Sequence, residues 1–194
     1  MPEAAPGIRI PPAPPGRTVE DGDYLREVIR QFQGLKKTAD KALAQTADAD
    51  FFRTLDPESN SIALIVKHVA GNMKSRWTDF LTTDGEKPDR RRDLEFALEP
   101  ADTRENLARR WEEEWSRLFA AIEPLSPEDF GKTVSIRGRA HTVLGAINRQ
   151  LAHYAYHVGQ LVFLAKHFAG SRWESLSIPR GQSEQFRPKT ERGG

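Results

Sequence analysis

The sequence predicts an all-α protein, a four-helix bundle with one long crossover connection. Four segments repeat apolar residues at spacings of three and four, the period that places them on one face of a helix. The connection between the second and third segments is long, which suits a crossover in a bundle. At 194 residues the chain is long enough for one domain, expected at residues 21–170 between a Pro-rich tail (1–20) and a polar tail (171–194).

The first two segments each carry one apolar stripe. The first stripe alternates strictly between steps of three and four, as at the seam of a bundle. Its residues are Leu25, Val28, Phe32, Leu35, Ala39 and Ala42. The second stripe begins after Ser59 or Asn60, either of which can cap a helix. Its residues are Ile62, Val66, Val69, Met73, Trp77 and Phe80.

The third and fourth segments have start and stop signals. Asp102 or Thr103, with Glu105 nearby, marks the start of the third helix, and Pro124 lies beyond its end. Its stripe is Leu107, Trp111, Trp115, Leu118 and Ile122. The fourth helix is expected to stop near Gly170. Its stripe is Ile147, Leu151, Tyr154, Val158, Leu161, Ala165 and Phe168.

Two connections have patterns of their own. Residues 84–100 are charged, and three consecutive arginines, Arg90 to Arg92, stand between acidic neighbours, which predicts a solvated crossover loop. Residues 132–142 alternate polar and apolar side chains around the turn dipeptide Arg137-Gly138. This pattern predicts a short β-hairpin between the third and fourth helices.

The composition and the N-terminal segment exclude several classes of function and location. The 29 Lys and Arg residues nearly balance 28 Asp and Glu residues, and a formal net charge of +1 argues against general nucleic-acid binding. The N-terminal tail has no apolar run behind a basic start, so we expect neither a signal peptide nor a membrane anchor. The chain has no cysteine, which excludes thiolate metal sites and Cys nucleophiles and fits a cytoplasmic location.

Three of the five histidines mark a candidate metal site. His153 and His157 are four residues apart on the fourth helix, so their imidazoles can converge on one ion. His68 lies midway along the second helix. Each of the three directly precedes a residue of its apolar stripe, so they would face one cleft if these helices are neighbours. His141 and His167 are interpreted as non-ligands.

The spacing alone leaves a second interpretation open. A histidine at the edge of a core, bonded to a backbone carbonyl, is commoner than a metal ligand. Carboxylates offer less, because Glu112, Glu113 and Glu114 point in different directions around the third helix and are interpreted as a solvated face. Residues 153–157 read HYAYH and lack the glutamate of a zinc peptidase, and no phosphate-binding glycine loop or GxSxG motif occurs.

Two regions carry a family resemblance. The second helix and the loop after it read SIALIVKHVAGNM at 61–73, RWTDFL at 76–81 and DGEKP at 84–88. The fourth helix reads AINRQLAHYAYHVGQ at 146–160 and is similar to a closing HxxxHxGQ element. From about residue 24 to residue 168 the chain resembles the DinB-like superfamily of DinB/YfiT-like metalloenzymes, in a branch of unknown function. The resemblance implies a DinB-like four-helix bundle with a divalent metal held by His68, His153 and His157.

The resemblance implies a site but not one reaction. Relatives include transferases and isomerases that use low-molecular-weight thiols, and without cysteine this chain would need such a thiol as an external cofactor. Three imidazoles suit zinc, nickel, iron or copper, of which we favour zinc or nickel. Asn72 and Ser75, one and two turns after His68, are candidates for supporting the ligands or contacting substrate. A capping or core-edge role is equally open for each.

Two classes of function therefore stay open. The leading hypothesis is a metal-dependent thiol transferase or isomerase acting on a small molecule. The alternatives are a non-catalytic bundle stapled by the ion, a small-ligand-binding protein, or a metal-dependent hydrolase. We expect no nucleic-acid or membrane partner. The aromatic stripe of Trp111, Trp115 and Phe119 is wider than one seam needs, which predicts a homodimer.

Overall fold

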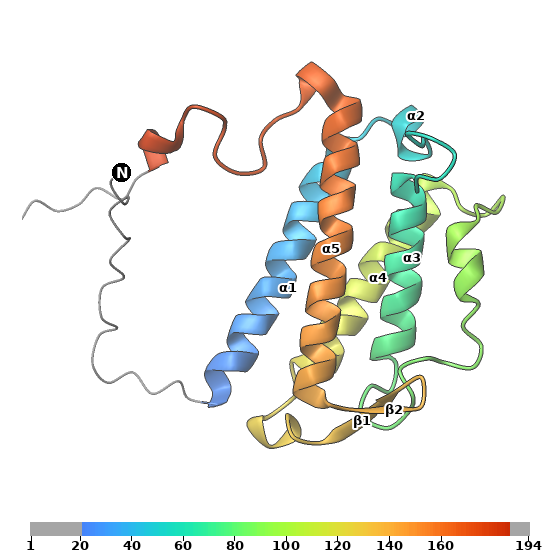
Figure 1. Cartoon of the computed structure of the whole chain (residues 1–194), viewed down its shortest axis with the longest axis vertical. Helices are drawn as coiled ribbons and strands as arrows, with labels where there is room; N and C mark the ends of the chain where they lie inside the picture. Colours follow the sequence, from blue (N-terminus) through green and yellow to red (C-terminus); the bar gives the residue numbers. More distant parts are fainter. Residues whose placement is uncertain (1–20, 187–194) are drawn as a thin grey trace, which may run out of the picture.

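A computed structural model describes residues 21–186 (Figure 1), so the predicted tail at 1–20 and residues 187–194 lie outside the described part. The four long helices are α1 (Asp21–Ala44), α3 (Ile62–Trp77), α4 (Arg104–Ile122) and α5 (Val143–Ala169). The short elements are α2 (Asp48–Phe51), β1 (Thr133–Ile136), β2 (Arg139–Thr142) and the 3₁₀ turns η1 (Arg92–Phe96), η2 (Pro127–Asp129), η3 (Gly170–Arg172) and η4 (Ser183–Phe186). The predicted four-helix bundle and the hairpin before its last long helix are confirmed.

The connections decide which helices are neighbours. Each long helix packs against two others: α3 against α4 and α5, and α1 against α5 and α4. In Figure 1 the connection at 78–103 returns along the side of the bundle, so α4 begins at the same end as α3 and runs in the same direction. The predicted crossover is therefore confirmed, and it leaves α3 and α5 side by side.

An aromatic cluster forms the centre of the core. Phe32, Trp77, Trp115 and Tyr154 come from the four long helices, and each is at most 2% exposed. The Tyr154 hydroxyl accepts a hydrogen bond from Trp77 Nε1 at 3.0 Å and donates one to Asn72 Oδ1 at 3.1 Å. A buried hydroxyl without partners would cost about 1–3 kcal/mol, so these bonds favour one rotation of α5 against α3.

Helix ends follow capping chemistry, with one correction. Thr103 is the N-cap of α4, and Gly170 ends α5 with a φ of +56°, as predicted. The N-cap of α3 is Ser61 rather than Ser59 or Asn60, because its hydroxyl accepts a hydrogen bond from Leu64 N at 3.2 Å.

The second apolar stripe extends beyond its helix. Phe80 lies outside α3, which ends at Trp77, but its ring still packs 4.9 Å from the Trp77 ring and is 9% exposed. A residue that continues the apolar spacing of a helix can therefore be buried in the core even though the helix has already ended.

A buried lysine fastens the crossover to α3. Lys67, 3% exposed, donates hydrogen bonds to Ala97 O at 2.7 Å, Glu99 Oε2 at 3.0 Å and Asp102 Oδ2 at 2.6 Å. An ammonium group buried without partners would strongly destabilise the fold. Because the partners of Lys67 come from the crossover, the crossover must pack against α3 at this residue. Because Lys67 directly precedes His68, η1 is held beside that histidine.

The β-hairpin is closed by a tight turn and tied to the loop after α3. Arg137 and Gly138 both have positive φ, 56° and 70°, as a type I′ turn requires. Asp84 accepts hydrogen bonds from Ser135 Oγ at 2.5 Å, Arg137 N at 2.8 Å and Gly138 N at 2.8 Å. The Asp84 carboxylate therefore fixes the hairpin turn near the end of α3, and it fixes the position of Arg137 along with the turn.

Three interpretations of individual side chains are wrong. Glu114 is not solvated but 7% exposed, and the Arg90 side chain is 5% exposed rather than part of a solvated loop. Trp111 and Trp115 lie inside the bundle at 2% and 0% exposure, and Trp111 Nε1 donates a hydrogen bond to Asp40 Oδ1 at 3.0 Å. The aromatic stripe thus fills one chain's core and gives no support for a homodimer, which stays a prediction.

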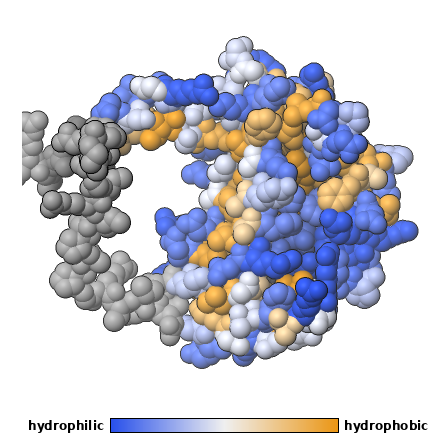
Figure 2. All heavy atoms as spheres, in the orientation of Figure 1, coloured by the Kyte–Doolittle hydropathy of each residue, from blue (hydrophilic) through white to orange (hydrophobic). Residues whose placement is uncertain are grey.

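The surface of the described chain is mixed. In the view of Figure 2, hydrophilic residues cover most of it and hydrophobic residues form smaller patches among them. On α5 the side chains of Tyr156 and Phe163 are 61% and 62% exposed. Within residues 21–186, no helix has the length and apolar character needed to span a membrane.

Candidate metal centre

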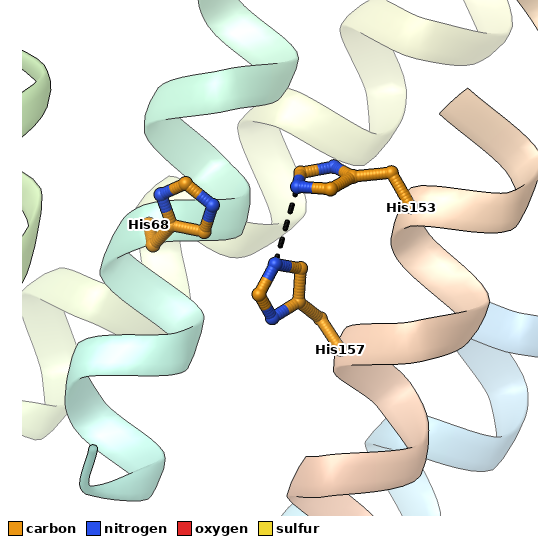
Figure 3. Close-up of side chains that lie close together, drawn as sticks. All are labelled: His68, His153 and His157. Atoms are coloured by element: carbon orange, nitrogen blue, oxygen red, sulfur yellow. Dashed lines mark hydrogen bonds between the residues drawn. The ribbon is translucent and has the colours of Figure 1, made fainter. Parts of the chain in front are cut away.

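Three imidazoles meet where α3 faces α5 (Figure 3). His68 extends from α3 and His153 and His157 extend from α5, one turn apart, with their rings directed toward one another. One nitrogen of each ring lies within 4.8 Å of the others. His68 and His157 are buried and His153 is half-buried. The structure therefore brings together the three histidines singled out from the sequence.

The Nε2 atoms of the two α5 histidines are separated by nearly the distance expected between two ligands of one ion. His153 Nε2 and His157 Nε2 are 3.1 Å apart. Two nitrogens bound at about 2.0–2.1 Å to a tetrahedral zinc ion are about 3.4 Å apart. His153 Nδ1 is buried and has no hydrogen-bond partner within residues 21–186. The all-imidazole donor set fits a divalent ion of the zinc or nickel type.

Hydrogen bonds fix which nitrogens carry protons. His157 Nδ1 lies 2.9 Å from Gln160 Oε1, and His68 Nδ1 lies 2.8 Å from Glu95 Oε2. Both oxygens can only accept, so each Nδ1 donates and each Nε2 keeps a lone pair. The opposite nitrogen of each ring is therefore the one available to an ion.

Burial keeps the α5 histidines neutral. Burial, with the nearby charges of His157, His68 and Arg76, lowers the pKa of His153 to about 3. Burial and His68 lower the pKa of His157 to about 4, although the hydrogen bond with Gln160 opposes the shift. Neutral imidazole is the form that binds a metal, so both side chains are in the ligand form at neutral pH.

Glu95 is the residue of the site that sequence reasoning missed. It lies on η1, is 6% exposed, and bonds His68 through Oε2. Arg90 Nε and Nη2 donate to its two oxygens, each at 2.8 Å. Burial raises the pKa of Glu95, but the hydrogen bonds from His68 and Arg90 outweigh it, and the pKa is lowered. A carboxylate behind a histidine orients its ring and strengthens it as a ligand.

Gly71 makes room for this carboxylate. A Cβ at Gly71 would stand 2.6 Å from Glu95 Oε1, closer than any real side chain approaches. A glycine inside a helix lowers its stability by about 1 kcal/mol relative to alanine. The presence of Gly71 three residues after His68 was therefore a sign in the sequence that another group packs closely against this part of the helix. The signal does not say which residue approaches.

A cavity of about 460 Å³ opens beside His68 and His153. Asn72 also lines it, as expected of a residue that supports ligands or contacts substrate. Ser75 does not line it, because its hydroxyl donates to Gly85 O at 2.7 Å and accepts from Lys87 N at 3.0 Å. Ser75 thus anchors the loop after α3, while Asn72 belongs to the cavity wall.

Comparisons with known proteins agree with this fold. A family described as "Protein of unknown function (DUF1572)" matches residues 20–182. A solved structure described as "YfiT from Bacillus subtilis is a probable metal-dependent hydrolase with an unusual four-helix bundle topology" is similar, with a TM-score of 0.62 and 15% identity over 82% of this chain and 95% of that one. No curated protein matches. The family match and the shared fold confirm the resemblance to the DinB-like superfamily.

Proposed function

The chain belongs to the DUF1572 family of proteins of unknown function, and we propose that it is a metal-dependent enzyme whose divalent ion is held by His68, His153 and His157. The observation that carries the proposal is the convergence of three imidazole nitrogens within 4.8 Å from two helices. If these were ordinary core-edge histidines, backbone carbonyls would satisfy their rings. Instead, His68 and His157 bond side-chain oxygens, and His153 Nδ1 has no partner among the described residues.

The open cavity favours catalysis over a purely structural ion. A structural zinc site is closed by four protein ligands, whereas catalytic sites keep a position for water or substrate. Here the group comprises three side chains of residues 21–186, and two of them line the cavity. Bound there, a divalent ion would act as a Lewis acid and lower the pKa of a coordinated thiol or water. Glu95 and Gln160 would hold the rings in orientation.

The first candidate reaction is transfer or isomerisation with an external low-molecular-weight thiol. It follows from the resemblance to the DinB-like superfamily and from the absence of cysteine, which leaves the chain without a thiol of its own. The second candidate is hydrolysis, with water in place of the thiol. The description of the YfiT structure as a probable metal-dependent hydrolase favours it.

Metal content tests the site. Protein purified without a His-tag should contain one zinc or nickel ion per chain by elemental analysis. The His153→Ala variant should lose the ion, and His141→Ala should keep it, because His141 lies outside the three-histidine group. Full metal content in His153→Ala, with loss in His141→Ala, would show that the ligands are assigned wrongly.

Cobalt substitution separates the two reactions. Titration of the cobalt protein with thiols should produce a sulfur-to-metal charge-transfer band that the His157→Ala variant lacks. If no thiol perturbs the metal, and ester or amide turnover occurs without thiol, the hydrolytic candidate replaces the transferase. If metal-loaded protein shows neither, the ion only joins α3 to α5.

A further inference from the structure

The cavity beside the histidines is lined by cations and by no carboxylate. Its charged lining consists of Arg76, Arg90, Arg92, Arg137 and Arg149. These side chains come from α3, the crossover with its 3₁₀ turn, the hairpin turn and α5. The whole chain has a formal net charge of only +1, so this cluster does not reflect a generally basic protein.

Arg76, Arg90 and Arg137 share few carboxylates. Glu86 lies within 3.3 Å of three guanidinium groups, those of Arg76, Arg90 and Arg137. Glu95 pairs with Arg90 alone among the cavity arginines and also bonds His68. One carboxylate thus serves three cations, and the second is committed to the histidine, so positive charge is in excess before any metal ion is added.

The charges of Arg92 and Arg149 are neutralised still less. Arg92 has its acidic neighbour Asp93 at 3.9 Å, and both side chains are exposed, at 49% and 102%. Such an exposed pair offers almost no neutralisation. The Arg149 side chain makes no hydrogen bond or ion pair with any residue in the described part of the chain. Its guanidinium group is therefore available to a ligand.

Unpaired buried atoms gather at the same cavity. Four buried side-chain nitrogen or oxygen atoms of residues 21–186 have no hydrogen-bond partner, and three belong to cavity residues: Arg76 Nε, Gln150 Oε1 and His153 Nδ1. Arg76 and Gln150 are 5% and 3% exposed. Buried polar atoms are seldom left unpaired, so this part of the bundle is unusually rich in polar groups that the described chain does not satisfy.

A second cavity adjoins the first and is also lined by arginines. It has a volume of about 310 Å³ and is lined by Ile136, Arg137, Arg139, His141 and Arg149. Arg137 and Arg149 line both cavities. The two cavities therefore share an arginine-lined border.

We propose that the arginine-lined cavity binds a small molecule through an anionic group, a carboxylate or a phosphate, and holds its other end toward His68 and His153. Arg149 is the main contact, because its exposed side chain has no partner within residues 21–186. Guanidinium groups match both anions through paired hydrogen bonds. The volume of about 460 Å³ suits a small molecule. The proposal rests on the proposed function, since it names the substrate class of the same site.

Calorimetric titration at constant ionic strength tests the proposal with simple probes. Succinate and inorganic phosphate represent the two anions, and succinamide is the neutral counterpart of succinate. We expect at least one anion to saturate a single site and succinamide to show no saturation. Saturation by phosphate alone identifies a phosphoryl ligand, and saturation by succinate alone identifies a carboxylate. If neither anion binds, the proposal is overturned.

Two variants separate a local contact from a change in net charge. Arg149→Gln should weaken anion binding by about tenfold or more, the effect of losing a charge-assisted hydrogen bond. Arg149 is exposed, so its substitution leaves the core intact. Arg109→Gln removes the same charge from an exposed position on α4, where the side chain pairs with Glu113, and should bind like the unaltered protein. Equal weakening in both variants would overturn the proposal.

Titrations of chelator-treated and zinc-loaded protein distinguish this proposal from the proposed function. Anion binding that depends on Arg149 in protein unable to retain zinc would support the anion site and reject the metal-dependent function. Zinc retained by the histidines without anion binding in either form would reject the anion site and leave the metal-dependent function intact.

Discussion

At the scale of single residues, Glu95 controls how His68 is presented. Its carboxylate is held by Arg90 and bonds His68 Nδ1 at 2.8 Å, so removing the charge should weaken the histidine as a ligand. We expect Glu95→Gln to lower metal affinity by about 10–100-fold in competition with a chromophoric chelator. Asp93→Asn on the same 3₁₀ turn is the control, because that carboxylate is fully exposed. Unchanged affinity in Glu95→Gln would show that the contact does not support the ligand.

Gly71 offers a test that leaves every polar group in place. A methyl group at this position would collide with the end of the Glu95 side chain, which must then move away from His68. Gly71→Ala should therefore reduce metal affinity in the same competition assay. Gly34→Ala in α1 is the matched control, since a methyl group there would have no other group within 4 Å. It should stabilise the helix by about 1 kcal/mol and leave metal affinity unchanged.

At the scale of elements, Asp84 links the hairpin to the end of α3. The Ser135 hydroxyl and backbone amides, including those of Glu86, Gly138 and Arg137, hold the pKa of Asp84 well below its usual value. A lowered pKa in the folded state contributes stability above the unfolded pKa of 3.8 that is lost as pH falls below it. Urea unfolding of Asp84→Asn should show a loss of about 1–2 kcal/mol at neutral pH and a smaller loss in acid. Equal stability of the two proteins at neutral pH would contradict this role.

At the scale of the whole molecule, an ion bound to His68, His153 and His157 would join two helices that are far apart in sequence. Because it binds only the folded state, a ligand concentration 100 times its dissociation constant adds about 2.7 kcal/mol of stability. For a domain of this size, a chelator should lower the melting temperature by about 5–10 °C. The His153→Ala variant should melt at the same temperature with and without chelator. Confirmed metal loss with no change in melting would contradict the contribution.

The expected homodimer is also a property of the whole molecule. The Trp111 and Trp115 side chains that suggested it are buried within one chain, so a dimer would have to use another surface. Light scattering at micromolar concentration should give twice the mass of 21.9 kDa if the prediction holds. A species of monomer mass would reject it.

Short-range periodicity in the sequence was enough to predict the four long helices and the hairpin and to single out the three histidines, which the family resemblance then implied as metal ligands. The patterns are apolar steps of three and four within a helix, alternation around Arg137-Gly138, and an i, i+4 pair at His153 and His157. His68 could be added because it stands at the same place relative to its own stripe. Phase along a helix is a local property, so it can be read before the fold is known.

The groups that stand behind and beside the histidines became visible only in the folded chain. Arg90 and Glu95 looked like parts of a solvated charged loop. Instead, the crossover folds back over α3, where Lys67 bonds it and Gly71 leaves room for it, and both side chains become buried. Likewise, the cavity arginines come from separate elements with no common period. Contacts between distant segments depend on chain path and on the pairing of buried charges, and a periodic pattern within one element contains neither.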